Sequence, residues 1–386
     1  MTEHATEQDQ SHIPIMAQMH DHVAHLIKVP ARTFYSDAKI LVDGFETVSD
    51  YYGLSEPIPM ADVYNGEAEA MGAKMIYSDK AMPTVDHSQP LIKRPGDLSK
   101  IKVPDWKTKS RLPYFMEIVK LCQERGFRNG ANFCAPFSLA VALRTYPKLI
   151  RDMRKDPAFA HELFTYLVDD ILTPYLIATH EVSGANIMIG ADAWAAFPNL
   201  SIPMLEEWVV PYIHRLAENL MPHGIIPIIT GSADYCEENP ANFDGNLLKQ
   251  ALDIQYSMMG EPFFVMFMGR WQDLPLEPLR DNLAQYHTDE DLPLIQAGVN
   301  ARMLRDGPVE LIVDAIKRYI HAIGRDNNVE LILANIPADT PPNHVHAAVA
   351  AAKTYGNYPI AKDLDALDFK ISSKPSFEEF MKGKKI

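Results

Sequence analysis

Short apolar segments alternate along this chain with longer segments whose apolar residues recur every three or four positions. The first kind predicts buried strands and the second predicts amphipathic helices. Strands are expected at 13–19, 187–189, 225–229, 263–268, 292–296 and 330–333, with another ending at Phe133. Helices are expected at 37–52, 67–71, 113–125, 147–155, 157–182, 203–221, 241–252, 276–285 and 309–323. A hairpin-like region at 74–79 and a long proline-rich connection at 83–106 complete the pattern.

Strands that alternate with helices predict parallel pairing through right-handed crossovers. The number of strand–helix units favours a closed barrel, and no glycine-rich nucleotide fingerprint follows the first strand, which disfavours a Rossmann sheet. We therefore predict an α/β fold, a single (β/α)8 TIM barrel with an N-terminal extension and extra helices. The barrel domain is expected to span residues 13–386, after a polar, frayed segment at 1–12.

The segment Leu331–Asn343 is the clearest of these units. It predicts a buried strand, a loop that ends in Pro341 and Pro342, and a helix that runs through Ala350. In a (β/α) barrel the chemistry lies at the C-terminal ends of the strands. Functional side chains are therefore expected directly after each strand.

Composition narrows the class of protein further. The chain is 47% hydrophobic and 23% charged, as is ordinary for a globular enzyme, and its formal net charge is −15. Such acidity disfavours nucleic acid and anionic membranes as partners. Cys122, Cys134 and Cys236 show no CxxC spacing, and no signal-peptide core or membrane-length apolar run is present. A cytoplasmic location is expected.

Five sequence blocks occur in order between Ile13 and Tyr358. They are Gly66–Ala73, Ala135–Ala140, Asp156–Phe159, Gly190–Trp194 and Asp339–Pro342. Together they resemble the superfamily of uroporphyrinogen decarboxylase and the corrinoid-dependent (cobalamin-dependent) methyltransferases. The first and fourth blocks are more similar to the methyltransferase branch. The resemblance implies a TIM barrel, a small-molecule substrate, a corrinoid cofactor on a separate carrier protein, and a possible homodimer.

The chain departs from both branches at functional positions. The haem-pathway decarboxylases carry arginines after the first strand, whereas Ala17–Ala24 contains none. The thiol-methylating enzymes bind zinc through a His-x-Cys pair and a later cysteine, and these positions align with Ile228, Thr230 and Ala334. The resemblance therefore implies a divergent member, for which true uroporphyrinogen decarboxylation and thiol methylation are both disfavoured.

Candidate catalytic groups follow the predicted strands. Gln18, His20 and His22 share one face if the first strand continues, so both imidazoles could enter the barrel mouth as proton carriers or zinc ligands. Each could instead be a cap or a solvent-exposed residue. Asp192 follows the strand at 187–189 and could bind a metal, move a proton or cap a helix.

Other candidates concern the substrate and a non-standard metal site. Gln18, Asp62, Tyr64, Thr230, Met266 and Asn300 are predicted substrate contacts, with a loop-stabilising role as the alternative for Asp62 and core packing for Met266. Asn300 stands where relatives often carry aspartate. Asp234 and Cys236 could supply displaced metal ligands beside His20 and His22, so that zinc remains possible, although such a displacement is rarely tolerated by loop geometry.

Three functional hypotheses follow. By resemblance, the first is methyl transfer between a small methylated ether or amine and a corrinoid protein, with acid or Lewis-acid help from His20 or His22. The second is a decarboxylase or carbon–carbon lyase that acts on a small carboxylate without corrinoid, with Asp192 as the acid–base group. The third is a catalytically retired barrel that binds a ligand or a partner.

Overall fold

The structure is a computed structural model that describes residues 11–127, 131–196, 199–230, 244–259, 263–266, 276–286, 294–325 and 328–384. Of the predicted frayed segment, residues 1–10 lie outside this description, whereas His12 pairs with Asn357 in an isolated bridge. The predicted metal ligands Asp234 and Cys236 also lie outside the described residues.

Parallel strands form the centre of the molecule. One sheet has the order β1 (Ile15–Ala17), β9 (Asn328–Leu333), β8 (Leu294–Val299), β7 (Phe263–Met266), and a second has the order β4 (Ala131–Cys134), β5 (Ile187–Ala191), β6 (Ile226–Thr230). Every pair within these two sheets is parallel. The first and last described strands pair directly, since Ile15 lies beside Leu331.

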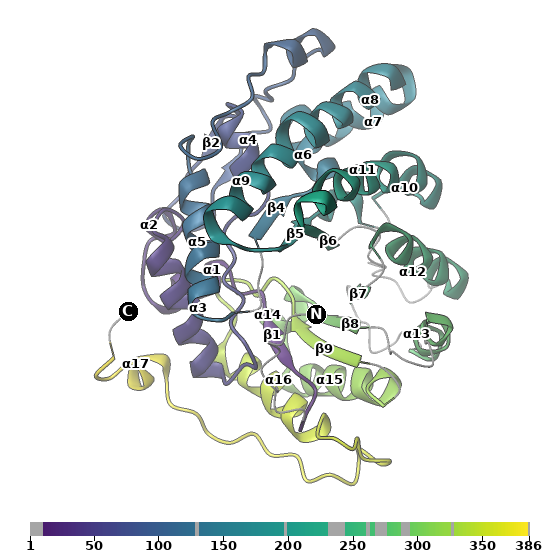
Figure 1. Cartoon of the computed structure of the whole chain (residues 1–386). Helices are drawn as coiled ribbons and strands as arrows, with labels where there is room; N and C mark the ends of the chain where they lie inside the picture. The colour runs from purple at the N-terminus through teal and green to yellow at the C-terminus, as the bar shows by residue number, and fades with distance from the viewer. Residues whose placement is uncertain are drawn as a thin grey trace.

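Helices enclose the strands on the outside (Figure 1). They are α1 (Asp21–Leu26), α2 (Ala31–Phe34), α3 (Ala38–Tyr52), α4 (Gly66–Ala70), α5 (Leu112–Glu124), α6 (Pro136–Arg144), α7 (Tyr146–Lys155), α8 (Pro157–Tyr166), α9 (Thr173–Ser183), α10 (Ile202–Trp208), α11 (Val210–Leu220), α12 (Gly245–Met259), α13 (Glu277–Leu283), α14 (Ala301–Asp306), α15 (Val309–Ile323), α16 (Pro342–Tyr355) and α17 (Phe377–Phe380). Strands and helices alternate, as predicted, from β4 to α16.

The predicted α/β class with parallel strands is confirmed, and the closed barrel is confirmed only in part. Among the described residues, hydrogen bonds join the strands into two parallel sheets and not into one continuous ring. Residues 56–60 lie between β1 and β4 in the chain and line one cavity together with both sheets. The two sheets therefore face a common interior.

Several elements differ from the sequence prediction for local physical reasons. Helix α6 was not predicted, because it is buried on all sides and so lacks an amphipathic period. The predicted helix at 157–182 contains a π-helical turn at Leu167–Leu172 between α8 and α9. The predicted helix at 203–221 divides into α10 and α11, with Pro211 in the first turn of the second. The proline-rich connection at 83–106 contains β3 (Thr84–Val85). This strand pairs with β2 (Met75–Ile76) in an antiparallel hairpin.

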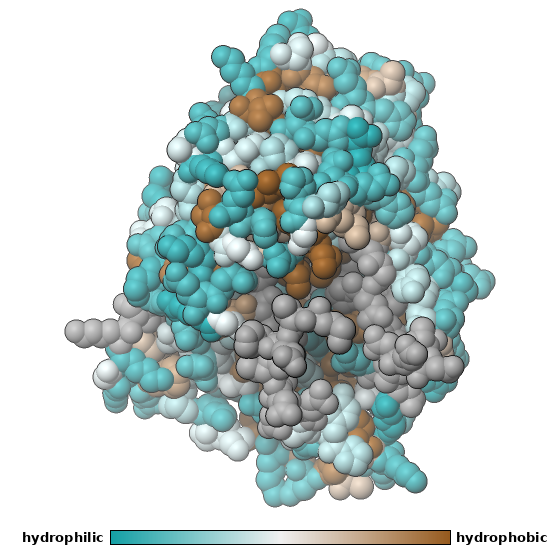
Figure 2. All heavy atoms as spheres, viewed as in Figure 1, coloured by the Kyte–Doolittle hydropathy of each residue, from teal (hydrophilic) through white to brown (hydrophobic). Residues whose placement is uncertain are grey.

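Close packing joins the strands to the surrounding helices. A Cβ placed on Gly190 in β5 would lie 2.6 Å from Phe133 Cζ and 2.6 Å from Ile229 Cδ1, so only glycine fits there. Outside this core, hydrophilic residues cover most of the face drawn in Figure 2. Among the described residues, no helix is long and apolar enough to cross a membrane.

After α16 the chain turns back along the outside of the molecule (Figure 1). Residues 357–376 connect α16 to α17, which packs against helices from the beginning of the chain. Phe377 of α17 contacts the Tyr51 ring of α3 at 5.2 Å between ring centroids, and Glu378 pairs with Lys28 at 2.7 Å. The C-terminal segment thus covers part of the N-terminal helices.

Candidate functional site

A cavity of about 290 Å³ lies between the two parallel sheets. It receives alternate side chains from the strands, as the pleat requires. Its lining residues are Met16, Gln18, Glu56, Ile58, Met60, Asn132, Ile187, Ile189, Ile228, Thr230, Leu294, Gln296, Glu330 and Ile332. The interior of a (β/α) barrel is ordinarily filled by side chains, so a cavity at this place is a candidate binding site.

The charge of the lining limits the kind of ligand that fits. Most of the lining is apolar, and its charged residues are Glu56 and Glu330. Glu330 is buried and accepts a hydrogen bond from Gln296 Nε2 at 3.0 Å. Within the part of the chain that the structure describes, the lining includes no lysine, arginine or histidine. A neutral or cationic ligand is therefore favoured over a carboxylate, which would meet like charge without a basic partner.

His20 lies between the C-terminal end of β1 and the start of α1, two residues after Gln18 of the cavity lining. Its backbone has φ 40° and ψ −119°, an unfavourable conformation for a residue with a side chain. Its Nδ1 is buried without a hydrogen-bond partner among the described residues, and burial lowers the pKa of the ring to about 4. The ring is thus neutral at neutral pH, and it can accept a proton or donate one hydrogen bond, but it has no extra proton to give.

The predicted face shared by Gln18, His20 and His22 is wrong, because β1 ends at Ala17 and α1 begins at Asp21. Gln18 lines the cavity, whereas His22 lies in α1 with Nε2 2.7 Å from the Tyr52 hydroxyl and Nδ1 3.2 Å from the Ala338 carbonyl. Burial also lowers the pKa of His22 to about 4. Both ring nitrogens hold packed elements together, so His22 has a structural role here.

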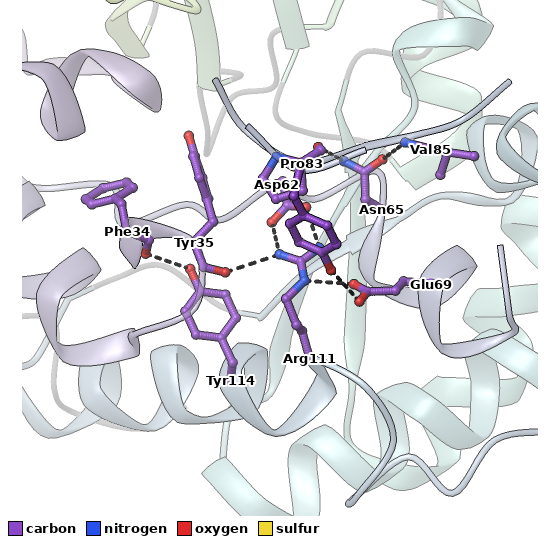
Figure 3. Close-up of polar contacts among 10 residues, drawn as sticks. Phe34, Tyr35, Asp62, Asn65, Glu69, Pro83, Val85, Arg111 and Tyr114 are labelled. Atoms are coloured by element: carbon purple, nitrogen blue, oxygen red, sulfur yellow. Dashed lines mark hydrogen bonds and ion pairs between the residues drawn. The ribbon is translucent and has the colours of Figure 1, made fainter. Parts of the chain in front are cut away.

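A buried ion pair supports the segment that follows residues 56–60. The Asp62 carboxylate accepts two hydrogen bonds from Arg111, the residue before α5, each 2.7 Å long (Figure 3). Arg111 Nε also donates to Glu69 at 2.7 Å. Tyr77 donates its hydroxyl to the same Glu69. Asp62 is 1% exposed, so the predicted substrate contact is fully occupied by an arginine of the scaffold.

Glu67 of α4 is the buried acid that sequence reasoning missed. Its Oε1 accepts a hydrogen bond from the backbone N–H of Cys134 at 2.9 Å, at the C-terminal end of β4. Burial raises the pKa of Glu67 to about 8, and the nearby Asp62 adds to the effect. Glu67 therefore carries a proton at neutral pH. Burial and the neighbouring acids Glu67 and Asp192 also raise the pKa of the Cys134 thiol well above its usual value, so this thiol is unreactive.

Asp192 reaches the start of α6 and not the axis. Ile187 and Ile189 of β5 line the cavity, and alternation along the strand points the buried Asp192 side chain the other way. Its Oδ1 accepts the backbone N–H of Ser138 at 2.7 Å, in the first turn of α6. The N-cap residue of α6 accepts no hydrogen bond through its side chain, so the Asp192 carboxylate takes this role for the Ser138 N–H. Of the alternatives, the helix cap describes Asp192 best.

The remaining predicted residues have mixed positions. Thr230 lines the cavity at the end of β6, and Tyr64 packs partly buried against the cluster of Met60, Val63 and Ala191. Asn300 is buried and caps α14 by accepting the Met303 N–H at 2.9 Å. Met266 belongs to β7, but its side chain is outside the described part.

Zinc does not fit the residues that the structure describes. Within them, no three histidine, cysteine, aspartate or glutamate side chains gather as a metal site would need. His20 and His22 face different surroundings, as given above. The predicted non-standard site therefore gains no support from the described residues, and we assign no chemical step to a metal.

The sequence gives little indication that Glu67 and Arg111 are buried. Glu67 lies in the Gly66–Ala73 block, but an acidic helix start is usually a solvated one, so nothing in the spacing indicates burial. Arg111 ends the segment 105–111, in which charged and uncharged residues alternate, and this pattern gives no sign of its buried partner. Both depend on contacts between segments that are distant in the chain.

Comparison with known proteins now places this architecture. The family model of uroporphyrinogen decarboxylase (URO-D) matches residues 1–355. The chain belongs to the URO-D family. Among solved structures, it is similar to a methyltransferase from Methanosarcina mazei, with a TM-score of 0.64 and 15% sequence identity over 89% of this chain and 94% of that one. No curated protein matches the chain in sequence.

The URO-D family membership confirms the resemblance inferred from the five sequence blocks. The likeness to the Methanosarcina methyltransferase extends over nearly the full length of both chains and shows a shared fold. At 15% identity the likeness concerns the fold alone. The chemistry must be argued from the cavity and from the residues beside it.

Proposed function

We propose that this URO-D family member transfers a methyl group from a small methylated compound to a corrinoid cofactor carried by a separate protein. The observation that carries the proposal is the cavity between the two sheets. It has the volume for a small molecule and walls of isoleucine, leucine and methionine, and the charged residues of its described lining are carboxylates. Such a lining suits a neutral ether or a methylated amine better than an acid.

The charge of the lining also weighs between the hypotheses. A decarboxylase must bind a carboxylate, for which arginine or lysine is the usual partner. Among the described residues the cavity lining contains neither. Arg111 is held in a buried pair with Asp62, and Arg144 in one with Asp152. Decarboxylation of a small acid in this cavity is therefore the weaker proposal.

The chain would bind and orient the donor. The apolar side chains of Ile189, Ile228 and Ile332 would hold its hydrocarbon part. Gln18 and Thr230, at the C-terminal ends of β1 and β6, would be the hydrogen-bonding groups for its oxygen or nitrogen. This orientation would present the methyl group to the C-terminal ends of the strands. When bound there, a corrinoid supplies a nucleophilic cobalt that takes the methyl group.

The proton balance depends on the donor. A quaternary amine leaves as a neutral amine and needs no proton, whereas an ether R–O–CH3 leaves as an oxyanion that must gain one. The neutral His20 cannot supply it at neutral pH. Glu67 is protonated beside the end of β4, but it does not line the cavity. The proton for an ether donor would therefore come from solvent water.

The proposal is tested with reduced free cobalamin in place of the carrier. The purified protein is mixed with 2-methoxyphenol, trimethylamine or tetramethylammonium, and the visible spectrum of the corrin is followed while the demethylated product is measured by mass spectrometry. Protein-dependent methylation of the corrin with at least one donor is expected. No product from any donor, together with carbon dioxide release from small carboxylates, would favour the decarboxylase hypothesis instead.

A further inference from the structure

A second cavity, of about 680 Å³, lies outside the barrel between the C-terminal segment and the helices that it covers. Residues 371–378 form one wall. The other walls come from the end of α1, from Tyr51 of α3 and from the first turns of α16, with Pro342, Asn343 and His346. Figure 1 shows α17 on the outside of the molecule, beside the N-terminal helices and away from the central strands. We call this cavity the strap groove.

His346 is the unusual residue of the strap groove. It is 6% exposed, and neither of its ring nitrogens has a hydrogen-bond partner among the described residues. Its ring packs edge-on against Tyr51 and Tyr52, at 4.7 and 4.9 Å between centroids, and these rings offer it no hydrogen bond. A buried imidazole with both nitrogens unsatisfied costs free energy that a bound ligand would recover.

Positive charge gathers around this histidine although the whole chain is strongly acidic. Lys374 lines the strap groove and forms no ion pair with any described residue, and it helps burial to lower the pKa of His346 to about 4. Lys28 also lines the groove, where it pairs with Glu378. The groove also contains the start of α16, a helix of 14 residues without a side-chain cap. Helix starts and ammonium groups both favour an anion.

Apolar side chains line another part of the strap groove, between polar residues such as Asn343, Ser376 and Glu378. Leu26, Tyr51, Pro375 and Phe377 contribute to its walls. A ligand that matches both parts has an oxyanion at one end and a hydrocarbon or aromatic body at the other. The volume is in the range of small-molecule sites.

We propose that the strap groove binds a small organic oxyanion, with Lys374 and the start of α16 on the anionic group and His346 donating a ring N–H to it. The ligand is of the opposite charge class to the donor favoured by the barrel cavity. The two sites are therefore separate, and this inference does not rest on the proposed methyl transfer.

The test is calorimetric titration of the full chain with phenyl phosphate, benzoate and inorganic phosphate. We expect phenyl phosphate to bind more tightly than inorganic phosphate, because only the former uses the apolar walls. Lys374→Ala is expected to weaken phenyl phosphate binding by tenfold or more. Lys370→Ala removes an equal charge from the same segment, at a lysine already paired with Asp368, and is expected to leave the affinity within twofold.

A second measurement reports on the histidine directly. Nitrogen NMR of the full chain is expected to show a shift of the His346 ring signals when phenyl phosphate is added, and His346→Gln identifies those signals. Circular dichroism of each variant checks that it folds as the wild type does. Equal affinity in wild type and Lys374→Ala, or an unchanged His346 signal at saturation, would overturn the proposal.

Discussion

Replacing Arg111 by methionine tests the claim that a buried ion pair holds the segment after residues 56–60 in place. Arg111 donates two hydrogen bonds to Asp62 and one to Glu69, all 2.7 Å long, and the Asp62 side chain is fully buried. Methionine keeps the length of the side chain and removes its charge. Asp62 then becomes a buried carboxylate without its partner, which costs about 3–5 kcal/mol of unfolding free energy.

The effect of Arg111→Met depends on pH with a defined sign. Burial already raises the pKa of Asp62, and Arg111 opposes this. Without the arginine the pKa rises further, and a protonated Asp62 no longer carries an unpaired charge. The loss of stability should therefore be smallest at acidic pH and grow as the pH rises through the pKa of Asp62.

Urea unfolding followed by circular dichroism at several pH values measures the effect. Arg215→Met is the matched control, since Arg215 makes a two-bonded pair with Asp169 whose side chains are 48% and 30% exposed. That variant should lose no more than about 1 kcal/mol. Adding Asp62→Asn to Arg111→Met should recover most of the loss. Equal, small losses of unfolding free energy in Arg111→Met and Arg215→Met would show that the buried Arg111–Asp62 pair does not hold this segment in place.

Two further predictions concern single groups. Because burial raises the pKa of Glu67 to about 8, the folded protein holds this proton more tightly than the unfolded chain. The free energy of unfolding should therefore fall as the pH rises from about 4.5 to 8. Urea unfolding should show no such fall in Glu67→Gln, which should be more stable than the wild type at about pH 9. Gly190→Ala should cost about 1–3 kcal/mol in thermal unfolding, because its Cβ meets Phe133 and Ile229, whereas Gly96→Ala, with no atom within 4 Å, should cost less than about 0.5 kcal/mol.

The sequence pattern predicted the fold well where the elements are amphipathic or regular. Helix α15 (Val309–Ile323) occupies the residues predicted for it, and β9 includes the predicted strand at 330–333. Helix α6 escaped prediction because every one of its nine residues is buried and no polar face marks its period. The first strand ends at Ala17, two residues before its predicted end, and this was enough to separate His20 from His22, which the period of two had placed together.

The candidate site was less predictable because its polar groups are decided by tertiary contacts. Asp192 has the sequence position of a catalytic carboxylate, yet it points to the first turn of a helix that the pattern did not reveal. Glu67 has the sequence position of a surface acid, yet packing of α4 against β4 buries it. Conversely, Gln18 and Thr230 were predicted from their places at strand ends, and both line the cavity.

The proposed methyl transfer requires that the cavity between the sheets binds the methyl donor. Thr230→Trp fills the part of this cavity at the C-terminal end of β6. Ile226→Trp places the same side chain at the start of β6, where the wild-type residue is 51% exposed. The decisive measurement is the rate of corrin methylation by the two variants with the best donor of the wild type. We predict loss of at least 100-fold in Thr230→Trp and a rate within threefold of wild type in Ile226→Trp. Undiminished methylation by a folded Thr230→Trp protein would contradict the account.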